Sequence, residues 1–182
     1  MLLRINRKPL ARCRTVRRLL SSFEYVNVRE TNKGYQILEM DRPPVNSFNL
    51  TLMRELITAV DDAEKSPHTR GLIITSAHNK SFGAGLDLVE MCNSDTEHLH
   101  SFWKSFSDSI SACLRHPWLL LRRLTGTAGA SALTLVCDYR VMAEGRLKIG
   151  LPTVHTGILL PLWLSKLFKL TVGVKEAERY LC

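Results

Sequence analysis

Two glycine-containing turns carry the residues whose types and spacing are best suited to chemistry. One is FGAGLDL (82–88), and the other is TGTAGAS (125–131). Each turn follows an apolar run and leads toward a helix, whose first backbone N–H groups have no intrahelical partner. Two such amides from neighbouring turns can hold one oxygen on which negative charge develops. Glycine at a strand-to-helix turn also serves tight packing, so the turns alone leave both interpretations open.

Cysteine and histidine are not arranged as metal ligands. The five cysteines contain no C-x-x-C pair, and their odd number favours a reducing compartment. The six histidines are scattered, and His98 and His100 would point away from each other on a helix. No metal site is predicted.

The hydrophobic pattern predicts an α/β chain that positions the two turns. Strands are expected at YQILEM (35–40), RGLIITS (70–76), WLLLRRL (118–124) and near Tyr139–Ala143. One helix should start at Asn49 or Thr51 and run to about Lys65, and a second should cover 95–115. The apolar face of this second helix is interpreted as core packing; its members are Leu99, Phe102, Trp103, Phe106, Ile110 and Cys113.

Positive charge is concentrated at the N-terminus. Residues 1–22 hold seven arginines and lysines and no acid, which leaves 18 of the 25 basic residues against all 17 acidic residues in 23–182. This near-neutral remainder argues against nucleic-acid binding. The Arg-rich segment 1–22 resembles a mitochondrial transit peptide, with a disordered basic arm as the alternative. We expect residues 23–182 to form the folded domain, in the mitochondrial matrix.

The sequence contains no apolar run that approaches the roughly 18 residues of a membrane span. The longest candidate, GILLPLWLSKLFKL (157–170), is interrupted by Pro161 and two lysines. It is therefore interpreted as a buried or amphipathic helix.

Five motifs, taken in order, resemble the crotonase (enoyl-CoA hydratase/isomerase) superfamily, and within it the mitochondrial enoyl-CoA delta isomerases. They are PPVNS, FGAGLDLVEMC, AGASALTLVCDYRV, IGLPTVHTGILLPLWL and GVKEAERYL. The resemblance covers about Val28 to Leu181. It implies an α/β fold with a ββα spiral core, an acyl-CoA thioester as ligand and no separate cofactor, since coenzyme A is part of the substrate. It also implies assembly into an oligomer, with copies of itself or with related subunits.

The resemblance implies a thioester-binding site built on the two turns. Ala84 N–H and Gly129 N–H would hold the thioester oxygen. The acyl-CoA would contact the stretch Ala84, Gly85, Leu86, Asp87 and Leu88, and Asp87 is expected to cap the helix that follows rather than to take part in catalysis.

The carboxylate that the family's isomerases use as base is absent. They carry an Asn-Glu pair where this chain has Pro152 and Thr153, in GLPTVHTG (150–157). A threonine cannot act as a base at neutral pH without an activating partner. The Glu of the family's hydratases would fall at Ala132. His155 is the nearest titratable side chain, and it is either a substitute base or a histidine at the surface or core edge.

Three functions therefore stay open. The chain is a working enoyl-CoA isomerase of fatty-acid β-oxidation, a non-catalytic acyl-CoA-binding or partner-binding relative, or an unstable truncated paralogue. The last alternative rests on the further C-terminal helical region that the resemblance leads us to expect after Cys182. Arg122 and Arg123 also stand where the family has small strand residues.

Overall fold

Two apolar runs of the sequence, which form β6 (Gly71–Ser76) and β9 (Leu119–Leu124), lie near the centre of a mixed β-sheet. The computed structural model describes residues 2–5, 17–18, 23–115, 119–124, 127–128, 132–144, 147–151 and 153–181. The strands of the main sheet are β1 (Leu2–Ile5), β2 (Arg17–Arg18), β3 (Val26–Glu30), β4 (Tyr35–Met40), β6 (Gly71–Ser76), β9 (Leu119–Leu124) and β11 (Tyr139–Ala143). Within the described ranges their order is β1-β11-β9-β6-β4-β3-β2.

Strands β4, β6, β9, β11 and β1 are parallel, whereas β2, β3 and β4 pair antiparallel. All four strands that the hydrophobic pattern predicts are confirmed, and β6 is buried at five of its six positions, as expected for a strand covered on both faces. The pattern did not predict β3. Strands β1 and β2 belong to the segment 1–22, whose role in targeting stays a prediction.

Four short strands outside the main sheet form or flank the glycine-containing turns. They form two parallel pairs, β7 (Ser81–Gly83) with β10 (Thr127–Ala128), and β5 (Ser47–Phe48) with β8 (Gly85–Leu86). The pairing of β7 with β10 confirms that the two turns of the sequence analysis are neighbours in space.

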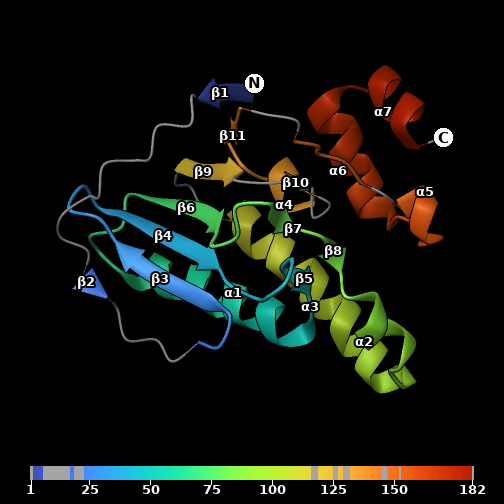
Figure 1. Ribbon diagram of the computed structural model, residues 1–182, viewed down its shortest axis with the longest axis horizontal. Helices are drawn as coiled ribbons and strands as arrows, with labels where there is room; N and C mark the ends of the chain where they lie inside the picture. Colours follow the sequence, from blue (N-terminus) through green and yellow to red (C-terminus); the bar gives the residue numbers. More distant parts are fainter. Residues whose placement is uncertain are drawn as a thin grey trace.

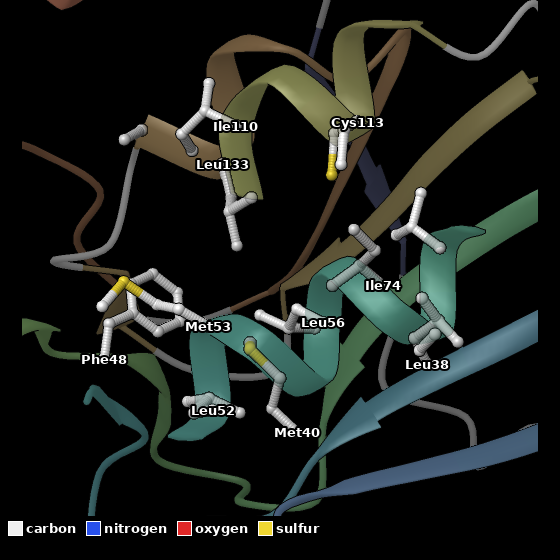
Figure 2. Close-up of a cluster of buried hydrophobic side chains, with 14 of the residues drawn as sticks. Leu38, Met40, Phe48, Leu52, Met53, Leu56, Ile74, Ile110, Cys113 and Leu133 are labelled. Atoms are coloured by element: carbon white, nitrogen blue, oxygen red, sulfur yellow. The ribbon is translucent and has the colours of Figure 1, made fainter. Parts of the chain in front are cut away.

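Helix α1 (Leu50–Lys65) covers one face of the sheet together with α3 (Thr96–Arg115), and Figure 1 shows the two helices behind the strands. Asn49, and not Thr51, is the N-cap of α1, since its Oδ1 accepts a hydrogen bond from Leu52 N–H at 2.9 Å. The apolar faces predicted for both helices are buried, except at Leu99 and Trp103 of α3, which are partly buried. Figure 2 shows their side chains meeting those of β4, β6 and α4 (Ala132–Leu135) in one core.

The remaining helices lie toward one end of the molecule, at the right of Figure 1. They are α2 (Leu88–Cys92), α5 (Thr153–Thr156), α6 (Leu162–Val172) and α7 (Val174–Leu181). Helix α6 contacts α4 and α7, and Leu164 of α6 is buried in the core cluster. Among the described helices none is long and apolar enough to cross a membrane.

Candidate functional site

An apolar cavity of about 110 Å³ lies where β8, α3, α4 and the α5–α6 segment meet. It brings together residues that are up to 116 positions apart in the sequence, from Phe48 to Leu164. Among the described residues that line it, none carries an ionisable side chain, and two threonines are the most polar. The lining consists of Phe48, Ala84, Gly85, Leu86, Leu88, Trp103, Phe106, Ala132, Leu151, Thr153, Thr156, Ile158, Leu160, Pro161 and Leu164.

The first glycine-containing turn forms one wall of this cavity. Ala84, Gly85, Leu86 and Leu88 all line it. Gly85 has a φ of 110°, which side chains with a Cβ rarely adopt, so the turn requires glycine at this position. The turn therefore depends on the backbone geometry at Gly85, and it presents Ala84, Gly85 and two leucine side chains to the cavity.

The backbone N–H of Ala84 is already used in this turn. It donates a hydrogen bond of 2.9 Å to the carbonyl oxygen of Val45. The expectation that this amide holds a thioester oxygen stays a prediction. In this conformation the amide is bonded to Val45, next to the paired strands β5 and β8. An oxyanion role for Ala84 would require the bond to Val45 to be exchanged.

Asp87 belongs to the same turn but does not line the cavity. Its Oδ1 accepts a hydrogen bond from Glu90 N–H at 3.2 Å, so it is the N-cap of α2. Its Oδ2 lies 2.8 Å from Arg42 Nη2, and the Asp87 side chain is only 13% exposed. The predicted capping role is confirmed.

Arg42 connects the turn that contains Asp87 to the segment around Ser47. Its Nη1 donates to the carbonyl oxygen of Ser47 at 2.9 Å, and its guanidinium lies 5.6 Å from the ring centroid of Tyr25. The pKa of Tyr25 is raised above its usual value, first by the hydrogen bond of its side chain with Glu24, whereas Arg42 acts to lower it. Both charges of the Arg42–Asp87 pair are therefore engaged in holding the chain.

A second, polar groove of about 740 Å³ adjoins the same segment. Asp87, Val89 and Glu90 line it, whereas Leu86 and Leu88 line the apolar cavity. Glu90 Oε1 lies 2.8 Å from His98 Nε2, and Glu90 Oε2 accepts from Leu50 N–H at 3.1 Å. The ionisable groups of this region thus face the groove.

Both positions where the resemblance places a catalytic glutamate lie on the apolar cavity. They are Ala132, on α4, and Thr153, the first residue of α5. His155 belongs to α5, and only its backbone is described. Gly129 and Pro152 lie outside the described residues, so their expected contacts with substrate stay predictions.

Aromatic residues that the sequence analysis interpreted only as core packing also shape the cavity. Phe106 is 4% exposed and packs in the core, yet both Trp103 and Phe106 line the cavity. Their rings lie 6.0 Å apart at an angle of 78°. The sequence indicates that these two aromatic residues share one helix face, but it does not indicate that they line a cavity as well as pack against the core.

The family of the chain follows from its similarity to known proteins. The family model for enoyl-CoA hydratase/isomerase matches residues 30–182. The chain belongs to the enoyl-CoA hydratase/isomerase family. The crotonase-like α/β fold and the family resemblance predicted from the motifs are therefore confirmed.

Two curated members of the enoyl-CoA hydratase/isomerase family are similar over most of this chain. Human mitochondrial enoyl-CoA delta isomerase 1 is 34% identical over 155 residues, which are 84% of this chain and 51% of the relative. The mouse protein of that name is 34% identical over 151 residues, which are 81% of this chain and 52% of the relative. This chain thus spans about half the length of these curated relatives.

Solved structures of the family superpose well on the chain. The crystal structure of human mitochondrial delta3-delta2-enoyl-CoA isomerase has a TM-score of 0.81 and 34% identity, and the match covers 86% of this chain and 62% of that one. An enoyl-CoA hydratase from Bacillus anthracis has a TM-score of 0.79 at 24% identity, covering 86% of this chain and 62% of the other. The second likeness supports the fold alone.

Proposed function

We propose that this chain is an acyl-CoA-binding member of the enoyl-CoA isomerase group, whose cavity accepts the acyl part of the thioester but lacks the base for efficient isomerisation. One observation carries the proposal. The two positions expected to hold a family glutamate, Ala132 and Thr153, both lie on one apolar cavity, and none of the described residues that line it carries an ionisable side chain. An apolar cavity suits an acyl chain, and a shift of a 3-enoyl-CoA double bond to the trans-2 position needs a group that moves a proton.

Binding in this proposal uses backbone and apolar contacts. The acyl group lies among Leu86, Leu88 and Phe106, and the thioester oxygen meets backbone amides of the two glycine-containing turns. Gly129 N–H is the expected donor from the second turn. Ala84 N–H contributes only if ligand binding displaces its bond to the Val45 carbonyl.

The second candidate is an active isomerase in which His155 replaces the glutamate. The observation that favours it is the position of His155 in α5, two residues after Thr153, which lines the cavity. An imidazole with an ordinary pKa titrates near neutral pH, as a general base requires.

A pair of measurements on the purified chain tests the proposal. We expect butyryl-CoA to raise the melting temperature, because a ligand that binds only the folded state stabilises it. We expect conversion of a 3-enoyl-CoA to the trans-2-enoyl-CoA to stay near the uncatalysed rate. Absence of any thermal shift or binding heat would overturn the proposal. Rapid isomerisation that is lost in His155→Ala would establish the second candidate instead.

We also propose a mitochondrial location, supported by the basic segment 1–22 and by the mitochondrial isomerases among the relatives. A fluorescent reporter fused behind residues 1–30 should enter mitochondria. A matched fusion in which the seven basic residues of 1–22 are replaced by glutamine should stay in the cytosol, and equal import of both would contradict the proposed signal. Assembly with itself or with related subunits remains a proposal, which sedimentation of the purified chain tests.

A further inference from the structure

We infer that the cavity admits only a short acyl group, of about four carbon atoms, and that Trp103 is the residue that sets this limit. The inference rests on the proposed acyl-CoA binding and adds the class of acyl group to it. It is carried by the volume of the cavity and by the aromatic side chains of α3.

The volume limits how much of an acyl chain can be buried. A cavity of about 150 Å³ lined by aliphatic and aromatic side chains accepts benzene, which has six carbon atoms. In proportion, the 110 Å³ of this cavity takes about four carbon atoms. A longer chain would leave its end outside the apolar lining or force the walls apart.

The wall formed by α3 is held in place by ring contacts. Trp103 lies between Phe102 and Phe106, with ring centroids 6.4 and 6.0 Å away and interplanar angles of 83° and 78°. Phe106 in turn lies 5.9 Å from Trp163 of α6. The two contacts of Trp103 are edge-to-face, an arrangement that is favourable and directional. The wall therefore does not yield easily to a longer chain.

Trp103 is the member of this wall whose removal enlarges the cavity at the smallest cost to the core. Phe106 is 4% exposed and Phe102 is fully buried, so truncating either ring would open the core itself. Trp103 is only partly buried and lies at the edge of the core cluster. Its side chain lines the cavity, whereas that of Trp163 does not.

Calorimetric titration with acetyl-, butyryl- and octanoyl-CoA tests the inference. Burying each methylene group tightens binding by about fourfold. For the unmodified chain we expect butyryl-CoA to bind roughly tenfold or more tightly than acetyl-CoA, and octanoyl-CoA to bind no more tightly than butyryl-CoA. In Trp103→Ala we expect octanoyl-CoA to bind at least about tenfold more tightly than butyryl-CoA, because the added space buries further methylene groups.

Leu170→Ala is the control, since it truncates an exposed side chain of α6 outside the cavity lining, and its dependence on chain length should equal that of the unmodified chain. Trp103→Phe should change the dependence in the same direction but less, and it keeps the measurement possible if Trp103→Ala does not fold. An unmodified chain that prefers octanoyl-CoA tenfold over butyryl-CoA would overturn the inference, as would a folded Trp103 variant with unchanged preference. If no acyl-CoA binds at all, the proposed function itself fails, and the inference fails with it.

Discussion

The segment from Ala84 to Glu90 presents two faces of opposite character. On one face Ala84, Gly85, Leu86 and Leu88 line an apolar cavity, where the residues that the structure describes include no ionisable side chain. On the other face Asp87 and Glu90 line a polar groove and pair with Arg42 and His98. The difference arises within seven consecutive residues.

This contrast shows where the carboxylates of the region are used. Asp87 caps α2 and binds Arg42, and Glu90 joins α2 to α1 and α3 through Leu50 N–H and His98. Both have structural partners that would have to be released before either acid could reach the cavity. The apolar face can therefore bind an acyl chain but supplies no carboxylate as a base. The polar face supplies carboxylates, and they lie on the groove and not on the apolar cavity.

Placing a carboxylate on the apolar face should produce the largest effect. We expect Thr153→Glu to raise the rate of 3-enoyl-CoA isomerisation about 10²- to 10⁴-fold, the usual contribution of a well-placed general base. Thr153 is the first residue of α5, where a negative side chain is favourable to the helix. The rate is measured with saturating substrate after binding has been confirmed.

Thr156→Glu is the matched control for this substitution. Thr156 lines the same cavity but stands at the other end of α5, so it adds the same charge at a different position. Equal gains from both variants would show that any acid in the cavity suffices. No gain from a folded, ligand-binding Thr153→Glu variant would contradict the assignment of Thr153 to the position of the base.

The next effect concerns the polar framework that supports the turn. Asn46 is fully buried, and its Nδ2 donates to Ser76 Oγ, the Phe82 carbonyl and the Met40 carbonyl at 2.8, 3.1 and 3.3 Å, while its Oδ1 accepts from Arg42 N–H at 2.7 Å. Asn46→Ala leaves these groups without this partner. We expect the free energy of unfolding to fall by about 3 kcal/mol, measured by urea denaturation.

Asn79→Ala is the control for the buried amide, because Asn79 is exposed, and it should change stability by less than about 0.5 kcal/mol. Asn46 also has a φ of 52°, a conformation that asparagine tolerates better than alanine. A loss below about 1 kcal/mol in Asn46→Ala would contradict the expectation that these buried hydrogen bonds contribute strongly to stability.

Much of the fold was predictable because its signals are local. The apolar run of β6, the helical spacing of α1 and the side chain of Asn49 each act within a few residues, and the structure confirms them. Strand β3, VNVRE (26–30), was missed because it is short and half polar. Its place in the sheet depends on pairing with β4, which is a tertiary interaction.

The candidate site was predictable in its position and less so in its detail. Motif order singled out Thr153 and the Ala84–Leu88 stretch, and the structure brings Thr153 and the stretch, except for Asp87, to one cavity, while their contacts with substrate stay predictions. The engaged N–H of Ala84 could not be foreseen, because its acceptor, Val45, lies 39 positions earlier and is brought close only by the pairing of β5 with β8. The contribution of α3 to the cavity lining could not be predicted for a similar reason. Helical periodicity indicates which side chains are buried, but it does not indicate whether a buried side chain contacts the core or a cavity.

The smallest effect should come from neutralising the polar face. Glu90→Gln keeps an acceptor for Leu50 N–H and a polar contact to His98, so it should cost less than about 1 kcal/mol of stability, as for other partly exposed ion pairs. We expect acyl-CoA affinity to remain unchanged, because Glu90 does not line the cavity. Glu90→Ala, which removes the acceptor of Leu50 N–H, should cost roughly 1–2 kcal/mol and likewise spare binding. A tenfold loss of acyl-CoA affinity in a stable Glu90→Gln protein would mean that the ligand reaches the polar groove, and that the two faces of the segment act as one site.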